Sequence, residues 1–334
     1  MKFLIVRFSS IGDIVLTTPV VRCLKKQAVT AEVHYLTKKT FLPVLAANPY
    51  IDKIHTLEND LDAVINKLQD EDFDYVIDLH HNLRTLRVKR GLDKQSFSFD
   101  KLNIKKWLLT SFKINRMPDV HIVDRYLDTL KSFNIKNDGQ GLDYFIPEKD
   151  QVKEEDIPAS HHAGYIGVVI GAALNTKKYP LHKLKELCSI IDHPIMLLGG
   201  KEDREEGDAI AAPDPVKIYN ACGKFNINES ADLVRRAKLI ISNDTGLMHI
   251  ASAFRKPVIS IWGNTVPEFG MYPYYPKAAP GAPSMFDIME VKGLGCRPCS
   301  KIGYDKCPKK HFKCMELTSP ESVYEKVKER LGRK

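Results

Sequence analysis

The sequence predicts an α/β protein of two domains, each built around a mostly parallel sheet, on three observations. The chain has 334 residues, more than one hydrophobic core usually organises. Short apolar runs bounded by turn residues alternate with helical stretches, as in strands joined by crossover helices. A polar, charged stretch at residues 147–160 without clear periodicity separates two such series. We therefore expect domains at residues 1–155 and 156–334.

The first domain is expected to open with a strand, a tight turn and a helix. Lys2 to Arg7 is apolar enough for a buried strand, Ser9 to Asp13 forms the turn, and a helix runs from Ile14 to about Gln27. Strand, short loop and helix make one βα unit. The apolar runs at residues 32–36 and 75–79, with a helical stretch at 61–68 between them, extend the same sheet.

The second domain repeats this layout. Its expected strands are residues 165–170, 194–198, 239–242 and 257–262, and its expected helices are 181–191 and 229–236. A cysteine-rich loop follows at residues 293–316. The last helix opens with Ser319 as N-cap, Pro320 at its first position and Glu321 in its first turn, and it ends near Arg330.

Composition and the lack of targeting signals favour a cytoplasmic globular protein. With 43% hydrophobic and 28% charged residues the chain is an ordinary globular protein and not a disordered one. The apolar run after Met1 is too short for a signal-peptide core, and no 18 uncharged apolar residues follow one another. Seven cysteines, an odd number, fit a reducing compartment better than a secreted disulfide framework.

The formal charge of +8 is unevenly distributed. Ten Lys or Arg and two Asp lie between His80 and Arg116. Such a stretch suits an anionic partner, which could be nucleic acid, a phosphorylated lipid headgroup or a phosphorylated saccharide. A solvated basic face with no partner is the other interpretation.

The turn after the first strand is the first candidate site. Ser10 and Gly12 are small, which lets the amides at the next helix's start approach an anion or a sugar. Asp13 follows at the carboxyl edge of the sheet, where a carboxylate could serve as a catalytic base. The alternative is that Asp13 only caps its own helix.

A second candidate site is the loop Ser242-Asn243-Asp244-Thr245-Gly246-Leu247-Met248-His249, which follows a strand and opens a helix running through Ala253. Thr245 offers a hydroxyl, Gly246 allows close backbone approach, and the helix N-terminus favours negative charge. These features predict a phosphate-binding turn. It is neither a Walker loop nor a dinucleotide fingerprint, and the α/β setting excludes the Asp-Thr-Gly of aspartic proteases.

Lys177, in the loop Thr176-Lys177-Lys178-Tyr179-Pro180, is the third candidate. The loop follows the first strand of the second domain and precedes a helix. An ammonium there could neutralise the charge that develops on a leaving diphosphate. We prefer Lys177 to Lys178 for this role. An ordinary surface lysine is the alternative.

The ordered set of motifs resembles the heptosyltransferases of glycosyltransferase family 9, from residue 6 to about residue 264. The motifs are Val6-Arg7-x-Ser9-Ser10-Ile11-Gly12-Asp13, Asp78-Leu79-His80, His121-x-x-Asp124-Arg125-Tyr126, Lys177-x-x-Pro180, Leu198-Gly199-Gly200 and Ser242-Asn243-Asp244-Thr245-Gly246-x-x-His249. The Cys-x-x-Cys at Cys296 also matches. The Asp244 motif, extended by Ala251 and Lys256-Pro257-Val258, is the most specific.

The resemblance implies a GT-B fold of two facing Rossmann-like domains and an inverting glycosyltransferase that needs no cofactor for catalysis. Asp13 would take the proton from the acceptor hydroxyl, which attacks the anomeric carbon in line. The diphosphate would leave toward Lys177. The implied donor-site residues are Ser10, Gly12, Lys177, Glu202, Asp244, Thr245, Gly246, Leu247 and His249.

The implied substrates are an ADP-heptose-like nucleotide sugar and the phosphorylated core of a lipopolysaccharide precursor, met at the inner face of the inner membrane. The N-terminal domain would hold the acceptor, through Arg84, Arg87, His121 and Arg125. Two departures bear on the substrates. The family's Asp-x-Gln-Gly segment is Asp78-Leu79-His80-His81-Asn82 here, and Met248 stands where smaller residues are common.

Metal binding is considered at two places. Cys296, Cys299, Cys307 and Cys314 could hold a structural zinc, although a second close pair is missing; a loop of reduced thiols is the alternative. The Asp-x-Asp pairs at residues 60–62 and 72–74 match the metal-diphosphate motif of other transferases. Because neither is expected to follow a strand, we assign them no metal.

Two other functions stay open from the sequence. A GT-B enzyme could use another nucleotide sugar, as a transferase or an epimerase. A basic nucleic-acid-binding protein would fit the charged stretch alone. No nucleic-acid motif or regular interleaving of aromatic residues supports the second of these.

Overall fold

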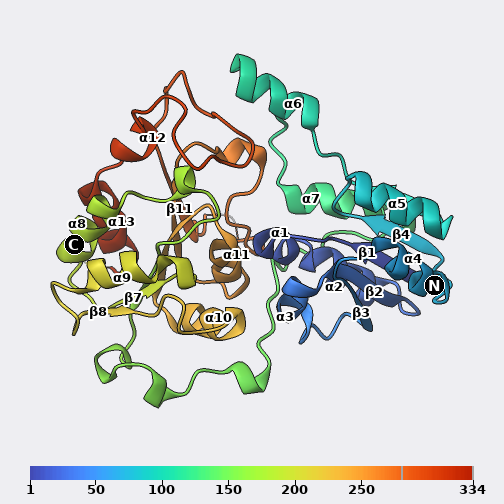
Figure 1. Ribbon diagram of the computed structural model, residues 1–334, viewed down its shortest axis with the longest axis horizontal. Helices are drawn as coiled ribbons and strands as arrows, with labels where there is room; N and C mark the ends of the chain where they lie inside the picture. Colours follow the sequence, from blue (N-terminus) through green and yellow to red (C-terminus); the bar gives the residue numbers. More distant parts are fainter. Residues whose placement is uncertain (280, 333–334) are drawn as a thin grey trace. The chain divides into compact units, whose positions relative to one another are not determined.

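The computed structural model describes residues 1–279 and 281–332 (Figure 1). The chain divides into two compact units. Unit 1 comprises Met1–Lys101 and Val120–Pro147, and unit 2 comprises Leu102–Asp119 and Glu148–Lys334. Each unit is an α/β layer structure around one parallel sheet, as the alternating pattern of apolar and helical stretches predicts.

Unit 1 contains a five-stranded sheet in the order β3-β2-β1-β4-β5. Every neighbouring pair is parallel. The strands are β1 (Lys2–Val6), β2 (Glu32–Lys38), β3 (Lys53–Leu57), β4 (Tyr75–Asp78) and β5 (Gln95–Ser98). Because Val6 pairs with Leu36 and with Asp78, the segments that follow β1, β2 and β4 emerge at one carboxyl edge.

The helices of unit 1 cover both faces of this sheet. The α-helices are α1 (Ile11–Val15), α2 (Thr18–Gln27), α3 (Leu42–Leu45), α4 (Leu61–Gln69), α5 (Leu83–Leu92) and α7 (Ile122–Leu127). Apolar residues of α4 and α5 form one core with β1 to β4. Helices α2 and α7 contact each other, apart from that core.

Unit 2 contains a six-stranded parallel sheet in the order β11-β10-β9-β6-β7-β8. Its strands are β6 (Ile166–Val169), β7 (Ile195–Leu198), β8 (Ile218–Asn220), β9 (Leu239–Asn243), β10 (Val258–Trp262) and β11 (Phe286–Glu290). The continuous apolar runs of β6, β7, β9 and β10 fit strands that are buried on both faces.

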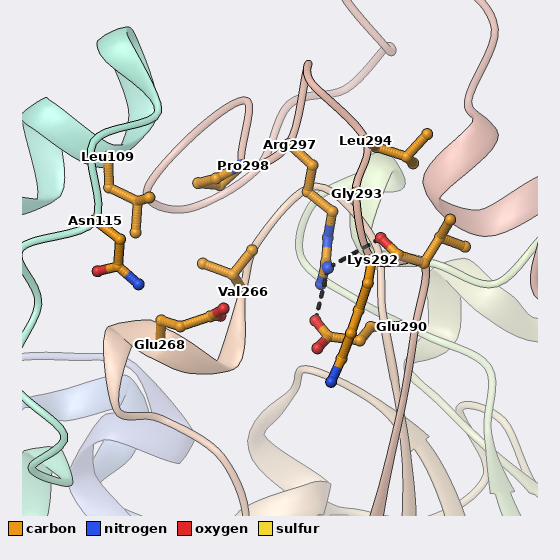
Figure 2. A pocket seen from close by; sticks show the side chains of 11 residues that line it. Leu109, Asn115, Val266, Glu268, Glu290, Lys292, Gly293, Leu294, Arg297 and Pro298 are labelled. Carbon is orange, nitrogen blue, oxygen red and sulfur yellow. Dashed lines mark hydrogen bonds and ion pairs between the residues drawn. The ribbon is translucent and has the colours of Figure 1, made fainter.

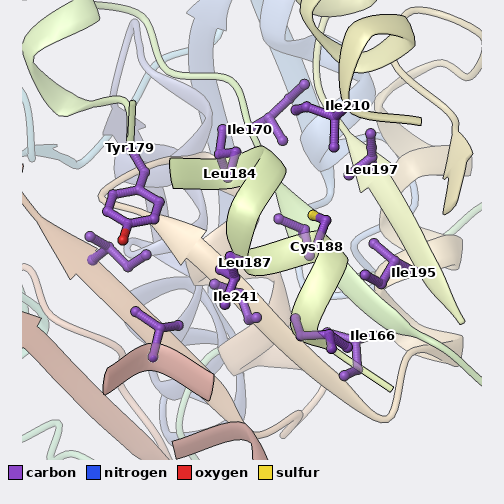
Figure 3. Packing of buried hydrophobic residues seen from close by; sticks show 14 of the residues in the cluster. Ile166, Ile170, Tyr179, Leu184, Leu187, Cys188, Ile195, Leu197, Ile210 and Ile241 are labelled. Carbon is purple, nitrogen blue, oxygen red and sulfur yellow. The ribbon is translucent and has the colours of Figure 1, made fainter. Parts of the chain in front are cut away.

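The helices of unit 2 are α6 (Asn103–Trp107), α8 (Leu181–Ile190), α9 (Arg204–Ala211), α10 (Ile227–Arg236), α11 (Gly246–Ala253), α12 (Lys313–Glu316) and α13 (Pro320–Arg330). Leu184, Leu187 and Cys188 project from α8 into the main core, toward sheet residues such as Ile241 (Figure 3). Helices α9 and α13 contribute to the same core. Helices α10 and α11 contact each other.

The first helix differs from the expectation in a way that matters for the site. A helix was expected from Ile14 onward, whereas α1 already begins at Ile11 and a second helix, α2, begins at Thr18. Pro19 at the start of α2 lacks the amide that a continuous helix would need. Asp13 therefore lies inside the first turn of α1 and not before it.

Four strands escaped the sequence analysis, namely β3, β5, β8 and β11. Their polar or half-buried residues break the apolar runs on which strand prediction rests. The expectation that neither Asp-x-Asp pair follows a strand is therefore wrong for Asp60, which comes after β3. Its side chain nevertheless caps α4 by accepting from the amides of Asp62 and Ala63.

The charged stretch at residues 147–160 contains three short 3₁₀ turns, Glu148–Asp150, Glu154–Asp156 and Ala159–His161. From Glu148 onward this stretch belongs to unit 2, where the amide of Val152 donates to the buried carboxylate of Asp232 at 3.0 Å. Among the described residues no helix is long and apolar enough to cross a membrane.

Candidate active site

Asp13 lies at the carboxyl edge of the sheet in unit 1, and three contacts orient its side chain. Oδ1 is 2.6 Å from the guanidinium of Arg7. Oδ2 accepts from the hydroxyl of Ser10 at 2.7 Å and from the amide of Ser10 at 3.2 Å. Asp13 therefore does cap its own helix, the alternative considered from the sequence. With 21% of its side chain exposed, the carboxylate is also accessible to a reactant.

Arg7, the ion-pair partner of Asp13, is a buried residue. Its guanidinium donates to the backbone oxygen of Leu79 at 2.6 Å, to the hydroxyl of Tyr126 at 2.9 Å and to the backbone oxygen of Ser9 at 2.7 Å. Burial alone would lower the pKa of Arg7, but the adjacent Asp13 carboxylate outweighs it and raises that pKa. Arg7 is thus a fixed cation that favours the ionised form of Asp13.

Ser10 and Gly12, both predicted to contact the donor, lie in the same turn. Ser10 is exposed and is the N-cap of α1, with its hydroxyl directed to Asp13. Gly12 is buried inside α1. In this arrangement Ser10 orients the carboxylate, and Gly12 presents no free surface of its own.

His80 occupies the same edge, in the segment where the sequence departs from the family pattern. Its ring contacts the ring of Phe8 edge-on at 5.4 Å between centroids. Burial, and then the nearby charge of Arg7, lower the pKa of His80 to about 4. This imidazole is therefore neutral at physiological pH and adds no charge beside Asp13.

In unit 2, Lys177 and Asp244 form an ion pair. The Nζ of Lys177, the last residue of the 3₁₀ turn Asn175–Lys177, is 2.6 Å from Oδ2 of Asp244. The same oxygen accepts from the hydroxyl of Thr265 at 3.0 Å. The three residues follow β6, β9 and β10, so their loops meet at one carboxyl edge. The structure thus brings the predicted site residues Lys177 and Asp244 into contact, and it adds Thr265 to the candidate site.

The start of α11 stands beside this ion pair. Thr245 is its N-cap, and Gly246 and Leu247 are its first residues, all partly exposed. The first amides of an eight-residue helix have no intrahelical acceptor, and its dipole favours an anion. His249, predicted in the same role, is buried with 2% exposure.

Lys178 and Glu202 have different surroundings. The Nζ of Lys178 contacts the buried carboxylate of Asp203 at 2.6 Å and Glu206 at 3.8 Å. Burial lowers the pKa of Lys178, but the hydrogen bond to Asp203 raises it overall. Lys178 is therefore occupied in a structural pair, which fits our preference for Lys177. Glu202 is exposed in the 3₁₀ turn Lys201–Asp203 after β7.

Arg297, which the sequence analysis did not single out, supports the loop that carries Thr265. Its guanidinium donates to the backbone oxygens of Gly263 at 2.6 Å and Thr265 at 3.0 Å. It also pairs with Glu290 at 2.6 Å. A small polar run after a buried strand could have indicated Thr265. No spacing in the sequence could have indicated Arg297 as a support of this loop, since it contacts the loop through the backbone oxygens of Gly263 and Thr265.

The cysteine-rich segment also holds the lysine loop. Tyr304 and Thr176 bond reciprocally: the amide of Thr176 donates to Tyr304 at 3.0 Å, and the amide of Tyr304 donates to the hydroxyl of Thr176 at 2.7 Å. The amide of Cys299 donates to the backbone oxygen of Asn264 at 3.1 Å. One segment thus supports the neighbours of both Lys177 and Thr265.

A cavity of about 370 Å³ opens beside Arg297 in unit 2 (Figure 2). Its polar side chains are Asn115, Glu268, Glu290, Lys292 and Arg297. In Figure 2 the Arg297 guanidinium points toward Glu290, with Lys292 beside them. The remaining lining is Leu109, Val266, Val291, Gly293, Leu294 and Pro298. The cavity can accommodate a polar group of mixed charge.

The predicted acceptor residues separate into two environments. Arg84 and Arg87 on α5 line a hollow of about 630 Å³ in unit 1, together with Asp60 and Asp62. Arg87 pairs with Asp62 at 2.6 Å, and both are well exposed. Arginines at such a surface remain available to an anion. The carboxylates around them give the hollow a mixed charge.

His121 and Arg125, in contrast, lie inside unit 1. His121 is the N-cap of α7, and its Nδ1 accepts from the amide of Val123 at 3.2 Å. Arg125 is 6% exposed, and burial lowers its pKa. Both positions support the packing of α7, which also carries Tyr126, the partner of Arg7.

The four clustered cysteines give the zinc prediction no support. Cys314 is buried, whereas Cys296, Cys299 and Cys307 are partly exposed. The thiol of Cys299 donates to the backbone oxygen of Cys296 at 3.0 Å. Throughout residues 1–279 and 281–332, the only three His, Cys, Asp or Glu side chains close enough to share one ion are elsewhere.

Comparisons with known proteins add to this geometry. The family model described as "Glycosyltransferase family 9 (heptosyltransferase)" matches residues 62–280. A curated relative, lipopolysaccharide heptosyltransferase 1 of Campylobacter coli, is 27% identical, and the alignment covers 79% of this chain and 84% of the relative.

Solved structures resemble the chain over nearly its full length. A glycosyl transferase family 9 structure from Veillonella parvula has a TM-score of 0.77 at 21% identity, covering 99% of this chain and 97% of that one. An E. coli heptosyltransferase solved with ADP has a TM-score of 0.70 at 19% identity, covering 99% and 100%. At such identities the likeness concerns the fold, and with the two parallel sheets it confirms the predicted GT-B fold.

Proposed function

Since the chain belongs to glycosyltransferase family 9, the heptosyltransferases, and is a glycosyltransferase, we propose that it transfers a heptose from an ADP-linked donor to a lipopolysaccharide core acceptor. The observation that carries the proposal is the Lys177–Asp244 pair beside the start of α11. A cation next to free helix amides suits a diphosphate. The ADP bound to the E. coli relative supports adenine as the nucleotide base of the donor.

We propose that Asp13 is the general base of an inverting transfer. Its carboxylate accepts the proton of the acceptor hydroxyl, whose oxygen attacks the anomeric carbon on the side opposite the diphosphate. The bond from the anomeric carbon to the diphosphate oxygen breaks, and the diphosphate leaves with the electron pair. Arg7 favours the ionised form of Asp13, which is the form that can accept a proton.

The leaving diphosphate is stabilised in unit 2. Lys177 and the amides of Gly246 and Leu247 supply positive charge and donors as negative charge develops. Asp244, held by Thr265, keeps the Lys177 ammonium in position. No metal is needed for this step, because cationic and amide donors occupy the place that a metal has in other transferases. The proposed donor residues are Lys177, Asp244, Thr245, Gly246 and Leu247, with Glu202 for the ribose.

Acceptor recognition is assigned to unit 1, through the exposed arginines of α5. Arg84 and Arg87 line an open hollow and can pair with phosphate groups of the acceptor. His121 and Arg125 act on the site through the packing of α7. The replacement at His80 gives this enzyme a neutral ring where the family pattern has the amide side chain of glutamine.

The function is tested by the donor that the enzyme accepts. We expect ADP-heptose to raise the melting temperature of the full chain and to support transfer to a deacylated lipopolysaccharide core. UDP-, GDP- and CDP-sugars should do neither, since binding to the folded state stabilises it by mass action. A larger shift and faster turnover with another nucleotide sugar would contradict the heptosyl assignment and leave the glycosyltransferase assignment standing.

We propose in addition that the segment beginning with α6 rests on the inner face of the membrane. Ile104, Trp107 and Phe112 are 75%, 49% and 57% exposed, and Trp107 and Phe112 contact each other edge-on at 5.0 Å between ring centroids. Leu109 on the opposite side is buried against Val266 and Phe269. The exposed lysines 105 and 113 add positive charge. Aromatic residues beside lysines suit an anionic lipid surface.

Removing the two aromatic side chains should weaken this contact. We expect the double variant Trp107→Ser, Phe112→Ser to bind phosphatidylglycerol vesicles about tenfold more weakly in a sedimentation assay. The reason is that serine cannot bury the apolar surface that each ring would insert into the lipid. Val216→Ser, which also replaces an exposed apolar residue of unit 2, is the matched control. Equal vesicle binding by all three proteins would refute the membrane contact.

A further inference from the structure

Two imidazoles and a carboxylate meet at the amino edge of the sheet in unit 1, the edge opposite to Asp13. His34 belongs to β2 and His55 to β3, and Glu71 follows α4 just before β4. Each of the three side chains offers a ligand atom, and these atoms all lie within 4.8 Å of one another. Nothing in the proposed transfer reaction uses them.

The distances within this cluster are close to those of a metal site. His34 Nδ1 and His55 Nε2 are 3.0 Å apart. Glu71 Oε2 is 3.8 Å from His34 Nδ1, and Glu71 Oε1 is 4.0 Å from His55 Nε2. Ligands about 2.0–2.1 Å from a tetrahedral ion stand roughly 3.3 Å apart. Small side-chain movements would therefore bring the three atoms to ligand positions.

A neighbouring carboxylate orients His34 for this role. Oε1 of Glu32 is 2.7 Å from Nε2 of His34, which is 1% exposed. If Nε2 carries the proton and donates it to Glu32, the lone pair of Nδ1 faces His55 and Glu71. Metal-bound histidines usually donate the proton of the second nitrogen to a carboxylate, a backbone carbonyl or water, and Glu32 is such a carboxylate. The ring of Phe73 covers both imidazoles, with centroids 5.2 and 6.1 Å away.

We propose that His34, His55 and Glu71 bind one divalent transition-metal ion of the Zn²⁺ class, with a remaining position open to water. Two imidazoles and one carboxylate are ligands that zinc accepts. Such an ion would join β2, β3 and the segment after α4 across the amino edge of the sheet. Its role is structural, since it lies at the opposite edge from Asp13. It is independent of the sugar donor.

Two lysines compete with the ion for its carboxylate. Lys53 forms an ion pair with Glu71, and the Nζ of Lys2 is 3.7 Å from Oε2 of Glu71. The Lys53 side chain is 54% exposed and can turn to solvent when an ion arrives. Removing its charge should therefore favour the metal. This gives a variant whose effect has the opposite sign from loss of a ligand.

The test uses the full chain with Cys296, Cys299 and Cys307 replaced by serine, so that exposed thiolates do not bind the probe. We expect titration with ZnCl₂ to give one ion per chain and a melting temperature about 5 °C higher at saturation. His55→Gln and Glu71→Gln should each lower zinc affinity at least tenfold. Glu32→Gln should lower it about tenfold through His34. Lys53→Met should raise it.

His182→Gln, an exposed histidine of unit 2, is the matched control and should leave zinc affinity unchanged. The proposal is overturned if the parent binds no zinc, or if His55→Gln binds it as tightly as the parent. Lys53→Met keeps the test decisive where a ligand variant folds poorly, because it removes no ligand. An unchanged or lower affinity in Lys53→Met would also count against the site.

Discussion

Asp13→Asn is expected to lower kcat for heptosyl transfer roughly 10³-fold, the loss typical of a missing general base. Asparagine has nearly the same shape and can still accept the hydrogen bonds from Ser10, so the helix cap is retained. It cannot take a proton at neutral pH. The measurement is initial-rate kinetics at saturating donor and acceptor. If Asp13 only caps the helix, kcat should change little, and if it is the general base, kcat should fall.

A loss of folding stability in Asp13→Asn has to be distinguished from a loss of catalysis. Asparagine leaves the buried Arg7 without its ionic partner, which costs stability because a buried charge is then uncompensated. Melting curves therefore accompany the kinetics. Asp128→Asn, the same change at an exposed carboxylate of unit 1, is the control. If folded Asp13→Asn keeps more than about a tenth of the parent kcat, Asp13 is a cap and not the base.

Lys177→Met is expected to reduce kcat about 10²-fold, since an ammonium that meets developing diphosphate charge stabilises the transition state more than the ground state. The loss should appear in kcat more strongly than in the KM for the donor. Asp244→Asn should show a smaller loss of the same kind, because it releases the Lys177 ammonium from its fixed position. Single-turnover rates would report the chemical step directly.

Lys185→Met, a change at an exposed lysine of α8, is the matched control and should behave as the parent. Lys178→Met should differ again. It leaves the buried Asp203 without its partner and is expected to destabilise unit 2 by about 3 kcal/mol. A loss of kcat in Lys178→Met larger than in Lys177→Met, at equal folded fraction, would reverse our assignment of the two lysines.

The cysteine-rich segment shows where local pattern was a poor guide. The spacing of four cysteines within 19 residues suggested a metal, yet the structure uses the segment as a support. Arg297, Cys299 and Tyr304 bond to backbone groups of the two loops that carry Thr265 and Lys177. Because each of these bonds has a backbone atom on at least one side, no pairing of side-chain types could reveal them in advance.

The four predicted acceptor residues differ in their exposure to solvent. His121 and Arg125 have the residue types of a phosphate-binding pair, and no local pattern indicated that they would be buried. The structure puts one at a helix cap and the other inside unit 1. Arg84 and Arg87 on α5 are exposed, whereas Thr85, Val88 and Leu92 of the same helix are buried. Helical position, and not residue type, separates the two pairs.

The fold class, most strands and helices, and the turns that carry Asp13, Lys177 and Asp244 could be predicted from the sequence alone. These features depend on the periodicity of apolar residues and on what directly follows a strand, and both are local. Which distant side chains meet depends on the tertiary structure. Arg7 reaches the backbone oxygen of Leu79 because β1 lies beside β4, and Lys177 reaches Asp244 because β6 lies beside β9. Strand order and register bring distant segments together, and no spacing along the chain encodes them.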